Sequence, residues 1–235
     1  RSRRWREDKL SMSYSDMSAL LTEWKKLPEF SWLREVSCVP LQQKLRHLER
    51  GYQRFFKWCR NRKGPKIGHP RFMKKRHRQS AEFTTSAFGW DGRMLTMAKS
   101  KEPLDLVWTQ PFWGDPSTMT ISLEPDGTWW VSLKVEVETV AAEGGRDAIG
   151  IDLGLTNYVM DDLGNRIDAP KTLRKSLDRL ARVQRAHARK AKGGKNREKS
   201  RRRVARVHAH VRRSRMDFLH KLSSKLIAEN QVICV

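Results

Sequence analysis

The sequence predicts a mixed α and β chain in three parts: a helical segment, a small antiparallel β-barrel and the first part of an α/β domain. Three observations support this fold class. Apolar residues recur at helical spacing in the first part and alternate with polar residues in the second. In the third they follow the order strand, hairpin strand, two long helices and strand. We expect the parts to span residues 1–63, 64–145 and 146–235.

Two helices are predicted in the first part. One runs from Ser15 to Leu27, with a capping box between Ser13 and Asp16, and Pro28 stops it. The other begins near Pro40, because proline suits a first helical turn. Its apolar stripe comprises Leu41, Leu45, Leu48, Tyr52, Phe55 and Phe56. The aromatic residues of this stripe are either core or a platform for stacking bases, and core is the commoner use.

The second part begins with a loop and continues as strands. Residues 64–72 are rich in glycine, proline and basic residues, which is typical of a turn that grips a nucleic-acid backbone. Alternating residues at 119–123 and 129–137 predict a hairpin with one apolar face, and residues 141–145 predict a linker. Four tryptophans could stack bases but are expected in the core: Trp108, Trp113, Trp129 and Trp130.

The third part has an α/β order. A strand ends near Asp152, and a second strand at 158–160 returns after it. Two helices at about 171–191 and 197–229 follow, and residues 231–235 begin another buried strand. The second helix keeps an apolar stripe that we expect to face the core: Val204, Val207, Val211, Phe218, Leu222 and Leu226.

The chain has a net charge of +23, and its charged residues are distributed unevenly along the sequence. Residues 46–78 hold 13 lysines and arginines against one acid, residues 171–221 hold 20 against 3, and residues 91–145 hold 4 against 9. Clustered basic residues are typical of surfaces that bind phosphate backbones, although a solvated tail would have the same composition. Neither basic block has a strong apolar face, which disfavours binding to a membrane surface.

The two basic blocks contain the residues that we expect to contact nucleic acid. They are Arg46, Arg50, Arg54, Lys57, Lys63, Lys66, Arg71, Lys74, Lys75, Arg76, Arg189, Lys190, Arg201, Arg202, Arg212 and Arg213. His208, His210 and His220 lie in the second block, where solvent-facing or packed histidines are commoner than ligands.

Several classes of protein are excluded or disfavoured. No apolar run is long enough to cross a membrane, and the first residues do not form a signal peptide. The chain starts on arginine, so we expect the natural N-terminus to be missing. Cys38, Cys59 and Cys234 lie far apart, which argues against a disulfide framework or a zinc site in this segment and fits a reducing cytoplasm.

Asp152 is the most informative candidate residue. It follows an apolar run that predicts a buried strand, where a lone carboxylate is costly unless a cation or hydrogen bonds offset the cost. Metal ligation, a helix cap and a turn all remain open at this point. Two-metal cleavage of phosphodiesters needs several acidic groups, and Asp152 alone cannot supply them. We interpret Asp161, Asp162 and Asp168 as turn residues.

The segment from Ile149 to Thr156 is similar to the first phosphate loop of Hsp70- and actin-like ATPases, whose ribonuclease H-like fold RuvC-type nucleases share. The basic blocks favour a nuclease. The wider chain resembles the TnpB (OrfB) family of transposon-encoded, RNA-guided DNA nucleases, relatives of type V CRISPR effectors. Four segments carry the resemblance: residues 41–56, residues 68–75, the strand with Asp152, and residues 217–222.

The resemblance implies a helical recognition segment, a wedge-type β-barrel and the first part of a ribonuclease H-like (RuvC) α/β domain. Asp152 matches the family's first catalytic aspartate, a Mg²⁺ ligand, and the implied partners are guide RNA and target DNA. In the family that the chain resembles, a Glu follows the strand that Val232 begins here, and a last Asp lies beyond a zinc ribbon. These groups lie outside the sequence, so we expect a fragment that is inactive alone. The alternatives are a non-catalytic nucleic-acid-binding transposon remnant, an RNA chaperone and an Hsp70-like ATPase.

Overall fold

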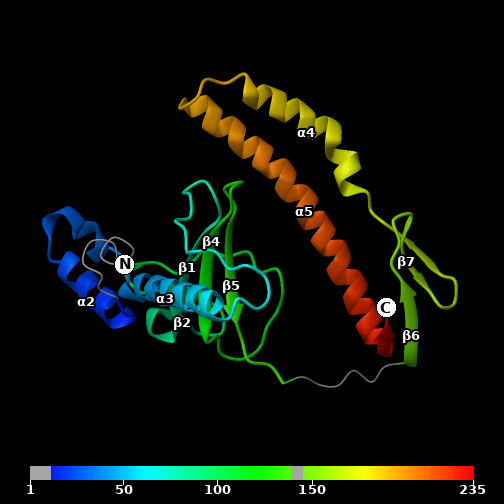
Figure 1. Ribbon diagram of the computed structural model, residues 1–235, viewed down its shortest axis with the longest axis horizontal. Helices are drawn as coiled ribbons and strands as arrows, with labels where there is room; N and C mark the ends of the chain where they lie inside the picture. The colour runs from blue at the N-terminus through cyan, green and yellow to red at the C-terminus, as the bar shows by residue number, and fades with distance from the viewer. Residues whose placement is uncertain (1–11, 139–144) are drawn as a thin grey trace. The chain divides into compact units, whose positions relative to one another are not determined.

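The computed structural model describes residues 12–138 and 145–235. The chain is mixed α and β, as predicted (Figure 1). It forms two compact units, and each is described by itself. The first unit holds the residues up to 124 together with 128–137, and the second holds residues 125–127 and 138–235. The predicted linker at 141–145 lies outside the described residues except for its last glycine, and the predicted three-part division stays a prediction.

The first unit begins with the predicted helices. Helix α2 covers Tyr14–Trp24, and its capping box is confirmed. The backbone N–H of Ser13 donates to the Asp16 carboxylate over 2.8 Å, and the backbone N–H of Asp16 donates to the Ser13 hydroxyl over 3.3 Å. A short 3-10 helix, η1, covers Pro28–Arg34 with proline in its first turn. The starts of both segments therefore follow from local sequence.

Helix α3 covers Cys38–Asn61, and the Ser37 hydroxyl caps its first turn. Part of its aromatic stripe packs against protein. Tyr52 is buried, and the ring of His69 from the following loop lies 5.0 Å from the ring of Tyr52 and 5.4 Å from that of Phe55. The loop thus folds back onto the helix, which favours the core reading of Tyr52. Phe56, by contrast, is exposed.

Two small antiparallel sheets complete the first unit. Phe83, Ala87, Leu95 and Met119 form the buried core that joins them. A three-stranded sheet has the order β1-β4-β5 and a separate ribbon pairs β2 with β3. No sheet of the described residues closes into a barrel, because three strands leave two edges unpaired. The strands are β1 (Gln79–Thr84), β2 (Phe88–Trp90), β3 (Leu95–Met97), β4 (Thr118–Leu123) and β5 (Trp129–Lys134).

The expectation that four tryptophans would fill the core of this unit is wrong. Trp108, Trp113, Trp129 and Trp130 are 44, 79, 66 and 39% exposed. Strand β5 is half-buried only at Val131 and Leu133, because Trp129 lies in phase with them but next to the turn, beyond the core. Trp108 instead packs on its neighbours Trp90 and Phe112, outside the hairpin.

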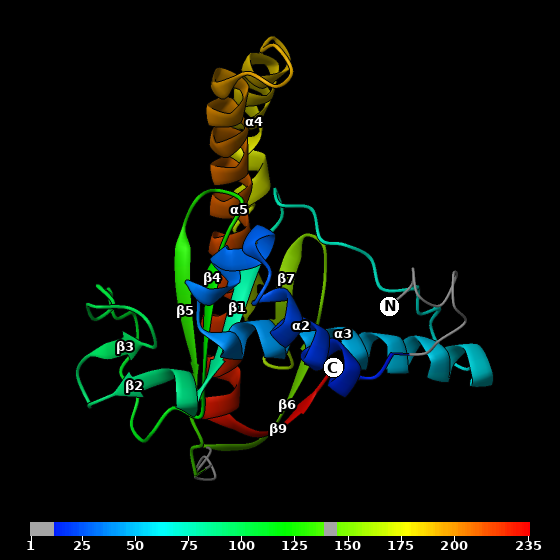
Figure 2. The same cartoon turned by 90° about the vertical axis from the view of Figure 1, so that its left-hand side faces the viewer.

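The second unit has the predicted order of elements with one addition, the short strand β8, which was not predicted. Its sheet has the strand order β8-β7-β6-β9, with β9 parallel to β6 and the other pairs antiparallel. Two long helices, α4 and α5, connect β8 to β9 and run side by side (Figures 1 and 2). The elements are β6 (Arg146–Asp152), β7 (Asn157–Asp161), β8 (Arg166–Asp168), α4 (Thr172–Ala188), α5 (Lys195–Glu229) and β9 (Asn230–Cys234).

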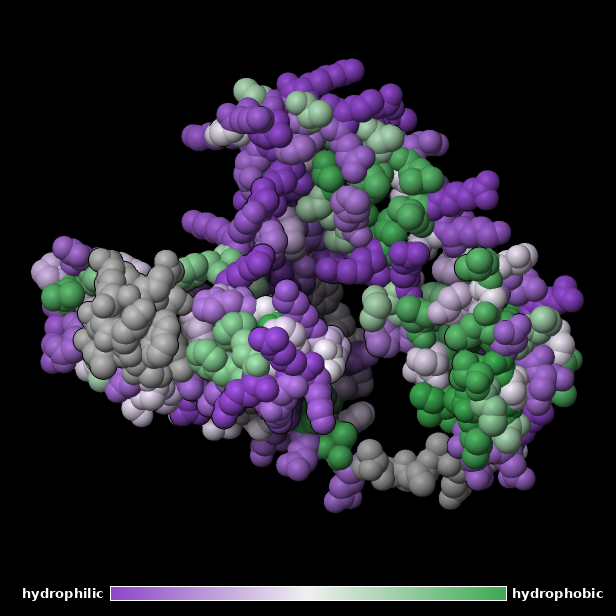
Figure 3. All heavy atoms as spheres, viewed as in Figure 1, coloured by the Kyte–Doolittle hydropathy of each residue, from purple (hydrophilic) through white to green (hydrophobic). Residues whose placement is uncertain are grey.

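Helices α4 and α5 pack through a narrow apolar seam. Leu180 of α4 and Val207 and Val211 of α5 are buried, and Gly193, with a φ of 85°, forms the turn between the helices. In the view of Figure 3 the hairpin surface is mostly hydrophilic, with apolar residues among the charged ones, and Leu173, Leu177 and Met216 are exposed. No helix among residues 12–138 and 145–235 has the length and apolarity that a membrane crossing requires.

Candidate metal and nucleic-acid site

Asp152 is the last residue of β6, where it pairs with Met160 of β7. The prediction that its carboxylate would be buried is wrong, because the side chain is exposed. The apolar run does form a strand, and Ile149 is buried in it. The strand ends at Asp152, however, and residues 153–156 leave the sheet and are exposed. The carboxylate therefore stays hydrated at the open end of β6.

Gly154 is required by the return of the chain from β6 to β7. A Cβ atom at this position would lie 2.8 Å from the carbonyl oxygen of Asn157, closer than a side chain tolerates. The backbone N–H of Gly154 also donates to the carbonyl of Tyr158 over 3.4 Å. The glycine thus permits a close approach of backbone to backbone.

The parallel pairing of β6 with β9 indicates what can lie beside Asp152. Ala148 pairs with Val232 and Gly150 with Cys234. If a chain continued β9 in the same register, the residue after Val235 would lie opposite Asp152. The carboxyl ends of parallel strands meet at one edge of a sheet, so side chains from both strands would converge there.

The neighbouring carboxylates Asp161 and Asp162 have structural partners. Their interpretation as turn residues is therefore confirmed. Asp161 accepts from Asn165 Nδ2 and from the backbone N–H groups of Asn165 and Leu163, at 2.7, 2.7 and 3.0 Å. These hydrogen bonds, that of the Asn165 side chain first, lower the pKa of Asp161. Asp162 forms a two-pronged pair with Arg146 at 2.8 and 3.0 Å, which lowers the pKa of that carboxyl.

Asp152 is one carboxylate, and a metal centre needs more. Within residues 12–138 and 145–235, no three His, Cys, Asp or Glu side chains gather as a metal site. An exposed carboxylate at a strand end does fit one coordination position of a hard cation such as Mg²⁺. The described residues therefore do not form a complete metal site.

The pair between Asp162 and Arg146 predicts a change in the pH dependence of stability. A carboxyl whose pKa is lowered on folding stabilises the folded state at pH values above 3.8, the ordinary pKa of the group. This stabilisation is lost as the pH falls through the lower pKa of the folded state. Asp162→Asn removes this contribution. The midpoint of thermal unfolding of the second unit should then fall less steeply between about pH 5 and about pH 3. Arg146→Gln should flatten the curve in the same way, and parallel curves for all three proteins would contradict the assignment.

The basic residues predicted on α3 form one exposed face. Arg46, Arg50, Arg54 and Lys57 are spaced by four or three residues, so they lie along one side of the helix. The guanidinium of Arg46 lies 5.2 Å from the centre of the Tyr14 ring, which leaves its other side accessible to solvent. The remaining predicted residues of this block are exposed in the irregular segment before β1: Lys63, Lys66, Arg71, Lys74, Lys75 and Arg76.

The predicted basic residues of the second unit differ in how far they are engaged. Arg189 and Lys190 are exposed between α4 and α5. Arg201 is held by Glu198 at 2.5 and 2.9 Å, which raises the pKa of Arg201, and Arg202 lies 3.7 Å from the same carboxylate. Arg212 is exposed and Arg213 is half-buried. His208, His210 and His220 are exposed, as expected.

Comparison with known proteins identifies the chain at the level of its family. Residues 132–235 match the OrfB_IS605 family, described as "Probable transposase". Over its whole length the chain is 45% identical to a "Putative RNA-guided DNA endonuclease" of Streptomyces pristinaespiralis, 58% of which it covers. It is 27% identical over 94% of its length to the "Putative RNA-guided DNA endonuclease InsQ" of Escherichia coli K12, 54% of which it covers.

The chain therefore spans about half the length of the curated relatives that it matches. The match to the Streptomyces protein extends over all 235 residues, so it includes both basic blocks as well as the strand with Asp152. Both the family match and the two relatives agree with the resemblance that was inferred from the sequence motifs. The chain belongs to the TnpB/OrfB family.

Proposed function

We propose that this chain is part of a transposon-associated, RNA-guided DNA endonuclease. The observation that carries the proposal is the combination of an exposed carboxylate at the end of β6 with a basic helical hairpin inserted into the same unit. Such a hairpin is suited to bind a polyanion, and the carboxylate is suited to bind a cation that acts on the bound polyanion. The names of the two relatives support the same activity.

Asp152 would be the first Mg²⁺ ligand of a ribonuclease H-like (RuvC) domain. The bound ion, when present, would activate water and stabilise the leaving oxygen of the phosphodiester. The second carboxylate would be the Glu that the family resemblance implies after the strand of Val232. The β6–β9 register supports this proposal, because it would bring that region of the chain beside Asp152.

The basic face of α3 and the α4–α5 hairpin would hold guide RNA and the guide–target heteroduplex. Contacts to phosphates position a nucleic acid without reading its sequence, and pairing to the guide would read the target. The two units would then act on the same polyanion. A closed wedge-type barrel would need strands beyond the three-stranded sheet and the two-stranded ribbon of the first unit.

Guided cleavage by a full-length protein that contains this segment tests the proposal. A plasmid should be cut in Mg²⁺ when the bound guide matches it, and should stay intact with a scrambled guide or with EDTA. A matched guide that binds without any cut would refute nuclease activity.

The second candidate is a non-catalytic nucleic-acid-binding protein, such as a transposon remnant or an RNA chaperone. One observation favours it: no three potential metal ligands gather among the described residues. This candidate predicts RNA binding of the same strength and salt dependence with no guide-dependent cleavage under any metal condition. The cleavage assay therefore separates the two functions, whereas a binding assay does not.

A further inference from the structure

Asp152 lies at a strand end that few contacts hold in place. On one side of β6, the pairing with β9 extends only as far as Gly150, two residues before Asp152. On the other side, β7 pairs with β6 at two positions, Ile151 and Asp152. Residues 153–156 then leave the sheet. Among the described residues, the position of the Asp152 carboxylate therefore depends on β7.

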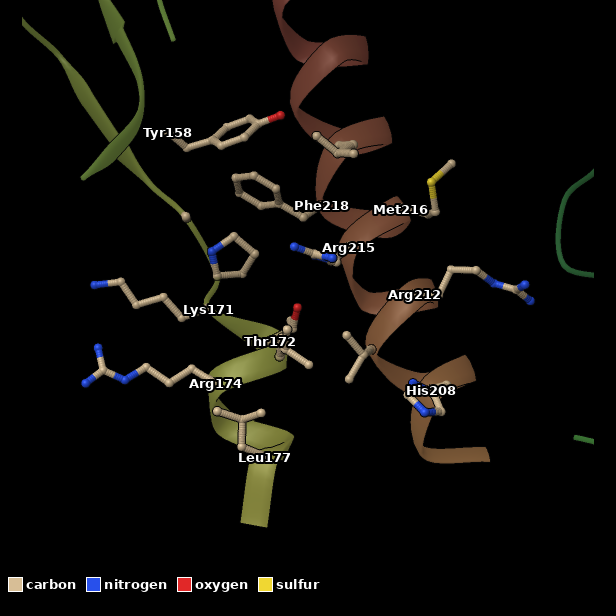
Figure 4. A pocket seen from close by; sticks show the side chains of 15 residues that line it. Tyr158, Lys171, Thr172, Arg174, Leu177, His208, Arg212, Arg215, Met216 and Phe218 are labelled. Atoms are coloured by element: carbon tan, nitrogen blue, oxygen red, sulfur yellow. The ribbon is translucent and has the colours of Figure 1, made fainter. Parts of the chain in front are cut away.

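Strand β7 is anchored at both of its ends. Near its start, the ring of Tyr158 packs edge to face on the ring of Phe218 from α5, with centroids 5.5 Å apart, in the hollow where β7, α4 and α5 meet (Figure 4). At its far end, Asp161 closes the following turn, because its carboxylate accepts from the side chain and the backbone N–H of Asn165. Strand β7 is thus a firm support for the end of β6.

Asp162, the residue after β7, joins this support to β6 in two ways. Its backbone N–H donates to the carbonyl oxygen of Gly150 over 2.9 Å. Its carboxylate forms the two-pronged pair with Arg146, the first residue of β6, at 2.8 and 3.0 Å. A guanidinium that binds both oxygens of a carboxylate also fixes the orientation of that carboxylate. Arg146 therefore holds Asp162 in the position from which its backbone N–H bonds to β6.

Small residues on one face of β6 make room for this pair. Side chains alternate along a strand, so four residues of β6 lie on the same face: Arg146, Ala148, Gly150 and Asp152. A Cβ atom at Gly150 would lie 3.6 Å from the Cβ atom of Asp162, so the Asp162 side chain begins directly beside this glycine. The small side chain of Ala148 leaves space for the long Arg146 side chain to reach it. The pair and the Asp152 carboxylate thus share one face of the sheet.

The pair acts on Asp152 through the backbone and not through its charge. Its two members have opposite charges and are 39 and 41% exposed, so their net field at Asp152 is weak. An ion pair that is so exposed also adds little to the stability of a whole domain. Its effect is therefore local to the two strands that it joins.

We propose that Arg146 and Asp162 are positioning residues, which hold the end of β6 so that the Asp152 carboxylate is ordered before a cation binds. The inference rests on the proposed function, because it takes Asp152 as the ligand of that cation. A ligand that is already ordered loses less conformational freedom on binding. Groups that orient a metal ligand directly change metal affinity about 10–100-fold when they are lost, and this pair acts one backbone hydrogen bond further away. Its loss should therefore weaken metal binding about five- to tenfold.

Hydrogen–deuterium exchange of a metal-free, full-length protein that contains this segment tests the positioning. In Asp162→Asn and in Arg146→Gln, the amides of residues 151–154 should exchange at least about threefold faster than in the original protein, because the end of β6 opens more often. Amides beside Leu180 and Val207, in the seam between α4 and α5, should not change. The two substitutions together should add no further acceleration, since either one already breaks the pair.

The Mg²⁺ concentration that guided cleavage requires is the second measurement. Asp162→Asn should need about five to ten times more Mg²⁺ for half-maximal cleavage, while its rate at saturating Mg²⁺ stays within about threefold of the original. Arg146→Lys, which keeps the charge and one contact, should shift the requirement less than Arg146→Gln. Glu229→Gln is the matched control in both measurements, because it removes a carboxylate charge from an exposed ion pair with Lys225 within α5.

Several results would overturn the proposal. Unchanged exchange at residues 151–154 in both single variants would show that the pair does not order the end of β6. Faster exchange throughout the second unit would show that the pair only stabilises the fold, and equal effects of Glu229→Gln would show that any lost ion pair suffices. If Asp162→Asn does not fold, Arg146→Gln and Arg146→Lys decide. A full-length protein that cuts no DNA would contradict the proposed function, whereas normal cleavage with unchanged exchange in the variants would contradict this inference alone.

Discussion

Replacing Asp152 with alanine should abolish DNA cleavage by a full-length protein that contains this segment. The carboxylate is exposed at the end of β6, so its removal should leave the fold intact. Loss of a residue that merely supports a metal ligand costs about 10–100-fold, so loss of a ligand should lower the cleavage rate at least about 100-fold. Affinity for guide RNA should not change, because the basic residues are untouched. Cleavage rates and RNA dissociation constants of both proteins measure this.

Asp168→Ala is the matched control for this experiment. Asp168 is an exposed aspartate at the end of β8 in the same sheet, two strands away from β6. Its replacement removes the same charge and should leave cleavage within about twofold of the original rate. If Asp152→Ala retains cleavage, or if both variants lose it equally, Asp152 is not a metal ligand.

Removing three charges from the basic face of α3 should weaken RNA binding on the order of 100- to 1,000-fold at about 0.1 M salt. Arg50, Arg54 and Lys57 are exposed on one side of the helix, so each can neutralise a phosphate. Each phosphate contact contributes about 0.7 to 0.9 to the slope of log affinity against log salt. The slope of the triple alanine variant should therefore be smaller by about 2 to 3. Fluorescence anisotropy at several salt concentrations measures both quantities.

The control for this variant removes three basic residues outside the two basic blocks. Arg93, Lys101 and Lys134 are exposed in the acidic region between the blocks. Their replacement by alanine changes the net charge equally and should lower affinity less than about tenfold, through the long-range field alone. Equal losses in the two triple variants would show that total charge, and not the α3 face, binds RNA.

The order of elements could be predicted from the sequence because it depends on local patterns. The capping box of Ser13 and Asp16, the hairpin around residues 125–127 and the glycine break between α4 and α5 each use contacts within a few residues. The observed helix ends differ from the predicted ones by only a few residues. These differences arise because terminal turns depend on caps such as Ser37, which lies before the predicted start of α3.

Burial was harder to predict because it depends on where an element ends. The apolar run before Asp152 does form a strand, but Asp152 is its last residue, so the carboxylate is exposed. Likewise, Trp129 follows the alternation of β5 and still lies beyond the core, next to the turn. In both cases the alternation of apolar and polar residues was read correctly. That alternation does not tell how far along the strand the covering surface extends.

The hollow where β7, α4 and α5 meet shows what local patterns cannot provide. Lys171 and Arg174 lie about 40 residues before Arg215 in the sequence, and only the return of α5 along α4 brings these residues to the lining of one hollow. Arg212 was selected from the sequence and Arg215 was not, because a run of basic residues does not reveal which side of the helix faces a partner. Helical phase relative to the buried Val207 and Val211 could have indicated that difference.

Iron-mediated cleavage of the protein backbone tests the metal site most directly. In a full-length protein that contains this segment, Fe²⁺ substituted for Mg²⁺ produces hydroxyl radicals that cut the polypeptide close to the bound ion. We expect cuts at residues 150–154 and in the chain directly after Val235, and expect excess Mg²⁺ or Asp152→Ala to abolish both sets. Cuts that persist in Asp152→Ala, or that map only to other segments, would contradict the assignment of Asp152 as a metal ligand.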